Sequence, residues 1–188
     1  LFTNLLAALA EAAPSALAEC EEWLKAAPPV KGVVVVAHGL NLRPAKMVEM
    51  GLRFRDAGYD VLVGAFTGHC RFVNELNMVQ PLHWEEDVRR MHGIASARAK
   101  ELGVPLSLVA YSFSALVFQV LAAEFPFGKR ILFAPAFETY FWYPIVVWIS
   151  GLIPNYAFHT LIPEGYYANQ RGGLRSMLAL NHFLKRWR

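Results

Sequence analysis

The sequence has few cysteines, few charged residues and no long apolar run, and each shortage excludes a class of protein. Two cysteines, Cys20 and Cys70, among 188 residues are too few for a disulfide scaffold. Charged residues make up 18 %, and glycine and proline follow no period, which excludes coiled-coil and collagen-like folds. A transmembrane helix needs about 20 apolar residues. The nearest stretch, 141–153, is shorter and carries Pro144, so we expect no spanning segment.

Basic residues are too dispersed to form a nucleic-acid surface. The net charge is +3, and the one dense basic block is Lys185–Arg188, which is typical of a solvated helix end. The two cysteines lie in no pairing motif, so we interpret them as unpaired and take a reducing, cytoplasmic compartment as the default. The apolar content of 55 % is ample for a buried core, and the length suits one domain.

Short apolar runs alternate with amphipathic stretches from residue 33 to residue 134. Such alternation predicts right-handed crossovers that build a mainly parallel sheet flanked by helices. The continuous β-branched run at 33–37 suits a strand that is buried on both faces. The expected strands are Val33–Ala37, Val61–Phe66, Leu106–Ala110 and Ile131–Ala134, and the expected helices are Pro44–Ala57, Trp84–Leu102 and Ser112–Phe125.

The chain divides into four stretches by composition. Leu5–Ala27 is rich in alanine, leucine and glutamate and predicts an N-terminal helix. Aromatic residues and prolines gather after residue 138, which predicts an inserted cap of short helical pieces. We therefore expect an N-terminal helical segment at 1–29, an α/β core at 30–137, an aromatic cap at 138–173 and an amphipathic helix at 174–188 that leads to further core strands.

The sharpest chemical signal is the sequence LVAYSFSAL at residues 108–116, where a strand runs directly into a helix. A serine at such a corner projects from the sheet at a helix N-terminus, where backbone N–H groups stabilise negative charge. The tight turn needs small residues two before and two after the serine, and Ala110 and Ser114 meet this need around Ser112. Ser112 is therefore a candidate nucleophile. The alternative is that it only caps the helix that follows.

The loop after the first strand offers a second component of the same site. Gly39 allows the backbone to turn close to a ligand. The Leu40 N–H would then face the same pocket as the Phe113 N–H, and two converging donors are what an acyl-transfer oxyanion requires. We interpret His38 as an imidazole that braces this loop, with proton transfer as the alternative.

The chain resembles α/β-hydrolases of the serine esterase and lipase type over residues 33–136. The resemblance implies that Ser112 is the nucleophile, that the backbone N–H groups of Leu40 and Phe113 form the oxyanion hole, and that no cofactor is needed. The sequence Gly-His-Cys stands where the family often has Gly-His-Gly, which implies a structural role for His69. The matching pieces are 33–40, 58–69, 84–88 and 106–114.

The pattern departs from the family after the serine. An acid and a histidine should follow the nucleophile in the sequence. No aspartate follows Asp87, and the later histidines, His159 and His182, do not follow a strand-like run. Glu138 comes just after the fourth run and is the candidate acid. Three accounts remain open: an Asp and a His in a C-terminal part of a longer chain, which we favour, a second polypeptide that supplies them, or a non-catalytic protein.

We therefore expect a carboxylic-ester hydrolase that acts through an acyl-enzyme on Ser112, with a small hydrophobic ester as substrate. The alternatives are a non-catalytic α/β-hydrolase-like binding protein or one half of a split hydrolase. No histidine pattern has the spacing of a metal site, so we expect no metal and no cofactor. The aromatic stretch is also compatible with contact to a membrane surface, with a peripheral location as the result.

Overall fold

The computed structural model describes residues 19–70, 75–138 and 141–188. Its main sheet has five strands in the order β1-β3-β2-β4-β5, and all neighbours are parallel except the antiparallel pair β1 and β3. This confirms the expected mainly parallel α/β fold. The strands are β1 (Glu22–Leu24), β2 (Gly32–Ala37), β3 (Tyr59–Gly64), β4 (Leu106–Tyr111) and β5 (Lys129–Phe133).

Helices cover both faces of this sheet because the strands alternate their apolar side chains between the two faces. Val33 and Val35 of β2 belong to the core on the side of the long helix α3, whereas Val34 and Val36 belong to the core on the side of α2. The helices are a 3-10 turn (Pro44–Met47), α2 (Val48–Asp56), a second 3-10 turn (Glu75–Asn77), α3 (Pro81–Leu102) and α4 (Phe113–Val120). The strands and helices predicted between residues 33 and 134 are therefore present, with ends shifted by a few residues.

The N-terminal prediction is wrong where it can be tested. Most of the helix expected at Leu5–Ala27 lies outside the described residues, but Glu22–Leu24 is a strand that pairs with β3. The unpaired assignment of the cysteines is also wrong, because Cys20 and Cys70 form a disulfide. Since disulfides persist in oxidising compartments, this bond removes the basis for the reducing default.

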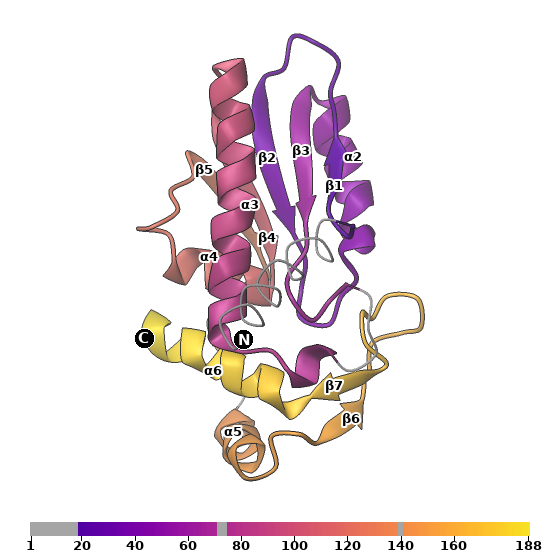
Figure 1. Cartoon of the computed structure of the whole chain (residues 1–188), viewed down its shortest axis with the longest axis vertical. Coiled ribbons are helices and arrows are strands. Elements are labelled where there is room, and N and C mark those ends of the chain that lie inside the picture. Colours follow the sequence, from indigo (N-terminus) through magenta and orange to yellow (C-terminus); the bar gives the residue numbers. More distant parts are fainter. Residues whose placement is uncertain (1–18, 71–74, 139–140) are drawn as a thin grey trace, which may run out of the picture.

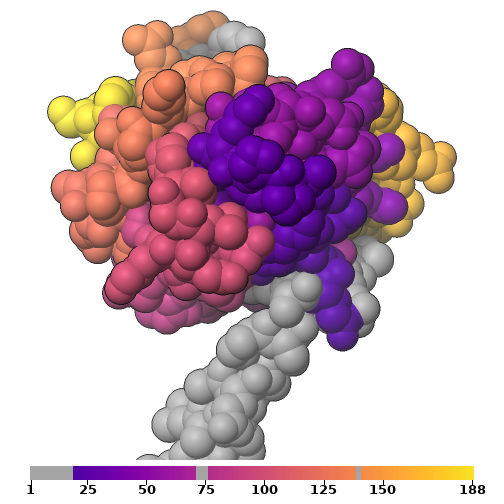
Figure 2. All heavy atoms as spheres, turned by 90° about the horizontal axis from the view of Figure 1, so that it is seen from above, coloured from indigo at the N-terminus to yellow at the C-terminus, as the bar shows by residue number. Residues whose placement is uncertain are grey.

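The chain after β5 forms a separate layer at the end of the sheet toward which the parallel strands point (Figure 1). We call residues 141–173 the aromatic segment. It comprises α5 (Tyr143–Leu152) and a two-stranded antiparallel sheet of β6 (Ala157–His159) and β7 (Arg171–Gly173), and α6 (Leu174–Trp187) follows it. Figure 2 looks onto the opposite end, where the segment after β1 lies between the end of α3 and the end of α2. Among the described residues, no helix has both the length and the hydropathy required to cross a membrane.

Candidate functional site: a serine at a strand–helix corner

Ser112 occupies a corner of unusual backbone geometry between β4 and α4. Its φ of 58° and ψ of −116° are rare for a residue with a side chain. The surrounding chain holds this conformation: the Ser112 N–H donates to the Phe133 carbonyl at 2.9 Å, and the Ser112 carbonyl accepts from the Ala136 N–H at 3.2 Å. A strained residue that neighbouring structure maintains is a mark of functional sites.

The side chain of Ser112 does not cap the helix that follows. No hydrogen bond from its hydroxyl to a described residue is present, which removes the capping interpretation. Ser114 stabilises the corner in its place. Its Oγ accepts from the Tyr111 N–H at 3.1 Å, and it lies 3.0 Å from the Tyr111 carbonyl and 3.2 Å from the Ala37 carbonyl. A glycine at position 114 would lack these contacts, so Ser114 contributes more than its small size.

The loop after β2 approaches Ser112 closely at Gly39. A Cβ atom on residue 39 would lie 2.7 Å from the Tyr111 ring and 3.5 Å from the Ser112 Cβ, so only glycine fits there without displacement. This contact places Leu40 beside the corner. The backbone N–H groups of Leu40 and Phe113 donate to no acceptor among the described residues, and both therefore remain able to bind a negatively charged oxygen.

His38 supports this loop and is not available as a base. Its Nε2 accepts the Phe66 N–H at 3.1 Å, so its Nδ1 carries the proton and donates to the Gly39 carbonyl at 2.9 Å. Both ring nitrogens are engaged, and the ring is fully buried. Burial lowers the pKa of His38 to about 4, so the imidazole is neutral at physiological pH. These contacts agree with the bracing role.

His69 lies in the buried cluster beneath the corner. Its ring is 4.6 Å from the His38 ring and stacks on Phe113 with a centroid distance of 5.3 Å and an interplanar angle of 13°. Nδ1 lies 3.2 Å from the Thr67 carbonyl. Burial, and the neighbouring His38, hold the pKa of His69 well below its usual range. His69 thus packs against the residue whose N–H is a predicted oxyanion donor.

The structure brings neither a base nor an acid to Ser112 among the described residues. Glu138 is exposed in the loop after β5 and makes no hydrogen bond or ion pair with any described residue. His159 is exposed on β6, and His182 on α6 lies 3.8 Å from Glu85. Among the described side chains, neither histidine makes a hydrogen bond or an ion pair with Glu138. The assignment of Glu138 as an acid remains a prediction.

An apolar cavity lies beside Leu40, between the aromatic segment and the core. Its volume is about 560 Å³. Tyr143, which lines it, donates its hydroxyl to the Met177 carbonyl at 3.1 Å, and burial raises the pKa of Tyr143 to about 12. None of the described residues that line the cavity is charged. The lining residues are Leu40, Trp142, Tyr143, Val146, Ile149, Ile153, Tyr156, Phe158, Leu174, Met177 and Leu180.

Strand β5 forms one edge of the main sheet, and part of its face lacks a cover. Tyr111 pairs with Phe133 and Val109 with Ile131, so Tyr111, Phe133 and Ile131 share one face. Ile131 and Phe133 are each 45 % exposed, in contrast to the buried strands at the centre of the sheet. Open strand edges and exposed apolar faces are sites where further polypeptide can add.

Asn41 and Asn169 were not found by the sequence reasoning. Both are buried, and they join the loop after β2 to the aromatic segment. The sequence does carry a signal for Asn41. Asparagine tolerates a positive φ, and an asparagine two residues after Gly39 indicates such a turn, which Asn41 adopts with a φ of 55°. No local signal marks Asn169, which lies 128 residues away in the sequence.

Comparison with known proteins identifies the fold. No family model matches the chain, and no curated protein sequence matches it. Solved structures do match. A metagenome-derived lipolytic enzyme, from work on LipS and LipT, has 17 % identity and a TM-score of 0.72, over 89 % of this chain and 68 % of its own. A soluble variant of monoglyceride lipase from Saccharomyces cerevisiae has 13 % identity and a TM-score of 0.76, over 88 % and 63 %.

A carboxyl esterase from Bacillus coagulans is similar as well, with 11 % identity and a TM-score of 0.63 over 88 % of this chain and 67 % of its own. The chain has the fold of the α/β-hydrolase superfamily. It spans only 63 % to 68 % of the length of these three structures. At these identities the likeness establishes the fold alone.

Proposed function

We propose that the chain carries the nucleophile and the oxyanion hole of a serine ester hydrolase. The observation that carries this proposal is the corner at Ser112: a strained serine whose hydroxyl has no partner among the described residues, next to two backbone N–H groups that have no acceptor among them either. In the proposed reaction, Ser112 Oγ attacks the ester carbonyl, and the Leu40 and Phe113 N–H groups stabilise the oxyanion of the tetrahedral intermediate. The alcohol then leaves, and water hydrolyses the acyl-enzyme.

The apolar cavity supports a substrate with a hydrophobic acyl group. Leu40 lines both the cavity and the proposed oxyanion hole, whereas Ser112 does not line the cavity. We propose that an acyl chain in the cavity passes Leu40 to bring its carbonyl carbon to Ser112. We propose that the aromatic segment acts as the cap over this substrate. A pocket that is apolar throughout its lining favours aliphatic chains over charged acids.

The base and the acid remain to be supplied, because a serine hydroxyl without a base is a poor nucleophile. We propose that an Asp and a His reach Ser112 from polypeptide that adds to the sheet at β5. The open edge of β5, the exposed Ile131 and Phe133, and the greater length of the similar structures support this proposal. The 188-residue chain by itself should therefore not turn over p-nitrophenyl esters.

Chemical rescue tests both parts of the proposal. A fluorophosphonate probe should modify Ser112 slowly, and imidazole added as an external base should raise the labelling rate at Ser112 by a factor of about 10 or more. Mass spectrometry of peptides identifies the modified serine, and the Ser112→Ala variant serves as the control. Labelling that does not respond to imidazole would contradict the proposal that this chain lacks the base, and so would rapid ester turnover by the chain alone.

A non-catalytic binding protein is the alternative, and the same experiment separates it from a hydrolase. If Ser112 stays unmodified in the folded chain even with imidazole, the hydrolase proposal fails. Binding of a fatty alcohol to the cavity would then be the property that remains. The binding protein keeps the cavity but does not need the two free N–H donors at the corner.

We further propose that the aromatic segment contacts a membrane surface. Ile145, Trp148 and Leu152 recur at helical spacing on α5, and they are 59 %, 66 % and 63 % exposed. Phe141 and Leu161 are almost fully exposed in the same segment. Apolar groups of this number on one segment are typical of interaction surfaces.

Vesicle binding checks this contact. The chain should sediment with phosphatidylcholine vesicles, and the double variant Trp148→Glu/Leu152→Glu should bind at least about 10-fold more weakly, because charged groups cannot enter the acyl boundary. Leu82→Glu/Ile94→Glu places the same two charges on exposed apolar positions of α3 and should leave binding unchanged. Equal loss in both variants would refute a specific contact by the aromatic segment.

A further inference from the structure

Asn41 joins the loop after β2 to the aromatic segment through its side chain. Its Oδ1 accepts the Asn169 N–H at 2.8 Å, and its Nδ2 donates to the Asn169 carbonyl at 3.0 Å. Nδ2 also donates to Thr160 Oγ1 at 3.1 Å. One buried side chain therefore holds both backbone groups of Asn169, in the way that a neighbouring strand would.

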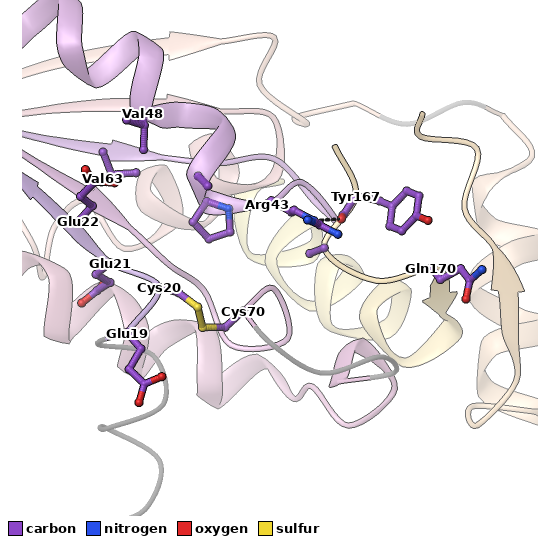
Figure 3. Close-up of a pocket in the computed structure, with 13 residues that line it drawn as sticks. Glu19, Cys20, Glu21, Glu22, Arg43, Val48, Val63, Cys70, Tyr167 and Gln170 are labelled. Atoms are coloured by element: carbon purple, nitrogen blue, oxygen red, sulfur yellow. Dashed lines mark hydrogen bonds between the residues drawn. A yellow bond between two sulfur atoms is a disulfide. The ribbon is translucent and has the colours of Figure 1, made fainter. Parts of the chain in front are cut away.

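Backbone contacts extend the same junction. The Ala168 N–H donates to the Asn41 carbonyl at 2.8 Å, and the Arg43 N–H donates to the Tyr166 carbonyl at 2.9 Å. The Arg43 side chain adds a hydrogen bond from Nε to the Tyr167 carbonyl at 2.7 Å (Figure 3). The loop that contains Leu40 is thus held at Asn41 and Arg43 by hydrogen bonds to residues 166–169.

Asn169 extends the junction to the other side of the proposed oxyanion hole. Its Nδ2 donates to the Gly68 carbonyl at 2.6 Å. Gly68 directly precedes His69, whose ring stacks on Phe113. The Asn41–Asn169 pair therefore contacts both loops that neighbour the two proposed donors, the Leu40 loop directly and the Phe113 side through His69.

We propose that Asn41 is a positioning residue that holds the Leu40 N–H at the site where negative charge develops. This inference rests on the proposed function of Ser112 and goes beyond it by assigning a role to a residue that does not touch the substrate. Oxyanion donors act over a narrow distance range, and a displacement of about 1 Å costs about 100-fold in rate. Leu40 directly precedes Asn41, so backbone motion at Asn41 would also displace the Leu40 N–H.

The same contacts give the aromatic segment a second role beside covering the substrate. If residues 166–169 hold the Leu40 loop in place, they form part of the reaction site. A cap that only shields the substrate could be removed without effect on the reaction of a small probe. Here, removal of the contact to Asn169 should slow the reaction of Ser112 even with a probe that is too small to fill the cavity.

Three variants separate positioning from folding. Asn41→Gly removes the side chain and still allows the positive φ, whereas Asn41→Asp keeps the acceptor for the Asn169 N–H and loses the donors. Thr160→Val removes the Oγ1 acceptor of Asn41 Nδ2 and of the Ile162 N–H but leaves both hydrogen bonds between Asn41 and the Asn169 backbone in place, so it is the matched control. Circular dichroism at the assay temperature shows that each variant is folded.

Labelling of Ser112 by a small fluorophosphonate with imidazole present is the first measurement. In Asn41→Gly the limiting rate should fall at least about 10-fold, while the probe concentration at half-maximal rate changes less than about twofold. Asn41→Asp should be intermediate, and Thr160→Val should stay within about twofold of the parent chain. A fall of equal size in Thr160→Val, or no fall in Asn41→Gly, would overturn the positioning role.

Nuclear magnetic resonance of the Leu40 and Phe113 amides is the second measurement, and it does not depend on labelling. In Asn41→Gly the Leu40 amide should show exchange broadening that is absent in the parent chain and in Thr160→Val. If Ser112 of the parent chain is never labelled, the proposed hydrolase function fails, and the amide spectra still decide the structural part of the inference. Unchanged Leu40 spectra in Asn41→Gly would overturn it.

Discussion

Loss of the disulfide between Cys20 and Cys70 should lower the free energy of unfolding by about 4 kcal/mol. The two cysteines are 50 residues apart in the sequence. A cross-link over a loop of this length removes about 4 kcal/mol of chain entropy from the unfolded state at 25 °C. The bond also joins the residue two positions before β1 to the loop after β3. Strand β1 has only three residues, so its pairing with β3 contributes little stability without this link.

Urea denaturation of the oxidised chain and of the Cys20→Ser/Cys70→Ser variant measures the difference. Dithiothreitol should destabilise the parent chain by a similar amount and should leave the double variant unchanged, which controls for effects of the serines. Thiol titration of the native parent chain should find no free thiol. A difference below about 1 kcal/mol would contradict the entropic contribution expected for this loop.

Most of the sheet could be predicted from the sequence because its signals are local. The run of valines at 33–36 can be buried on both faces only in a central strand, and the structure places it there as β2. The corner at Ser112 was found for the same reason, since a strand, a serine and a helix follow one another without a gap. Every residue that defines this geometry lies within a few positions of Ser112.

Strand β1 could not be predicted because its stability comes from distant residues. The composition around Trp23 favours a helix, yet this segment forms a strand because it pairs with the edge of β3. Trp23 then packs toward one core and Leu24 toward the other. Tertiary context overrode local propensity, as it does for short segments at the edge of a sheet.

The candidate site was predicted only as far as its local part. Ser112, Leu40 and Phe113 belong to short motifs, so the sequence indicates them directly. The junction of Asn41 with Asn169 and the disulfide depend on residues 128 and 50 positions apart, and no periodicity links such pairs. Long-range polar contacts of this kind become visible only when the fold brings them together.

The free energy of unfolding should also fall by about 2 to 3 kcal/mol between pH 7.5 and pH 5. His38 and His69 are buried and neutral, and their pKa values in the folded chain lie below the ordinary 6.5, with that of His38 at about 4. The unfolded state therefore binds two protons in this range that the folded state does not. A histidine that stays neutral in the folded state costs at most about 2 kcal/mol of stability at pH 5.

Asp87 opposes this effect. Burial raises its pKa to about 6, against hydrogen bonds from the Thr67 N–H and Arg90 that lower it. Between pH 7.5 and pH 5 the folded state thus binds a proton at Asp87 that the unfolded state does not, and this offsets about 1.4 kcal/mol. Because the effect of the two histidines exceeds that of Asp87, the free energy of unfolding falls as the pH is lowered.

Urea denaturation at the two pH values checks the sign and the size. His69→Phe keeps a ring to stack on Phe113 and should reduce the difference to below about 1 kcal/mol, because one proton is removed from the balance. His159→Gln changes an exposed histidine whose side chain makes no ion pair with a described residue, and it should leave the difference unchanged. A free energy of unfolding that is constant or rises toward pH 5 would mean that the buried imidazoles bind protons without loss of packing. The neutral pair beneath Ser112 would then not limit the acid stability of the corner.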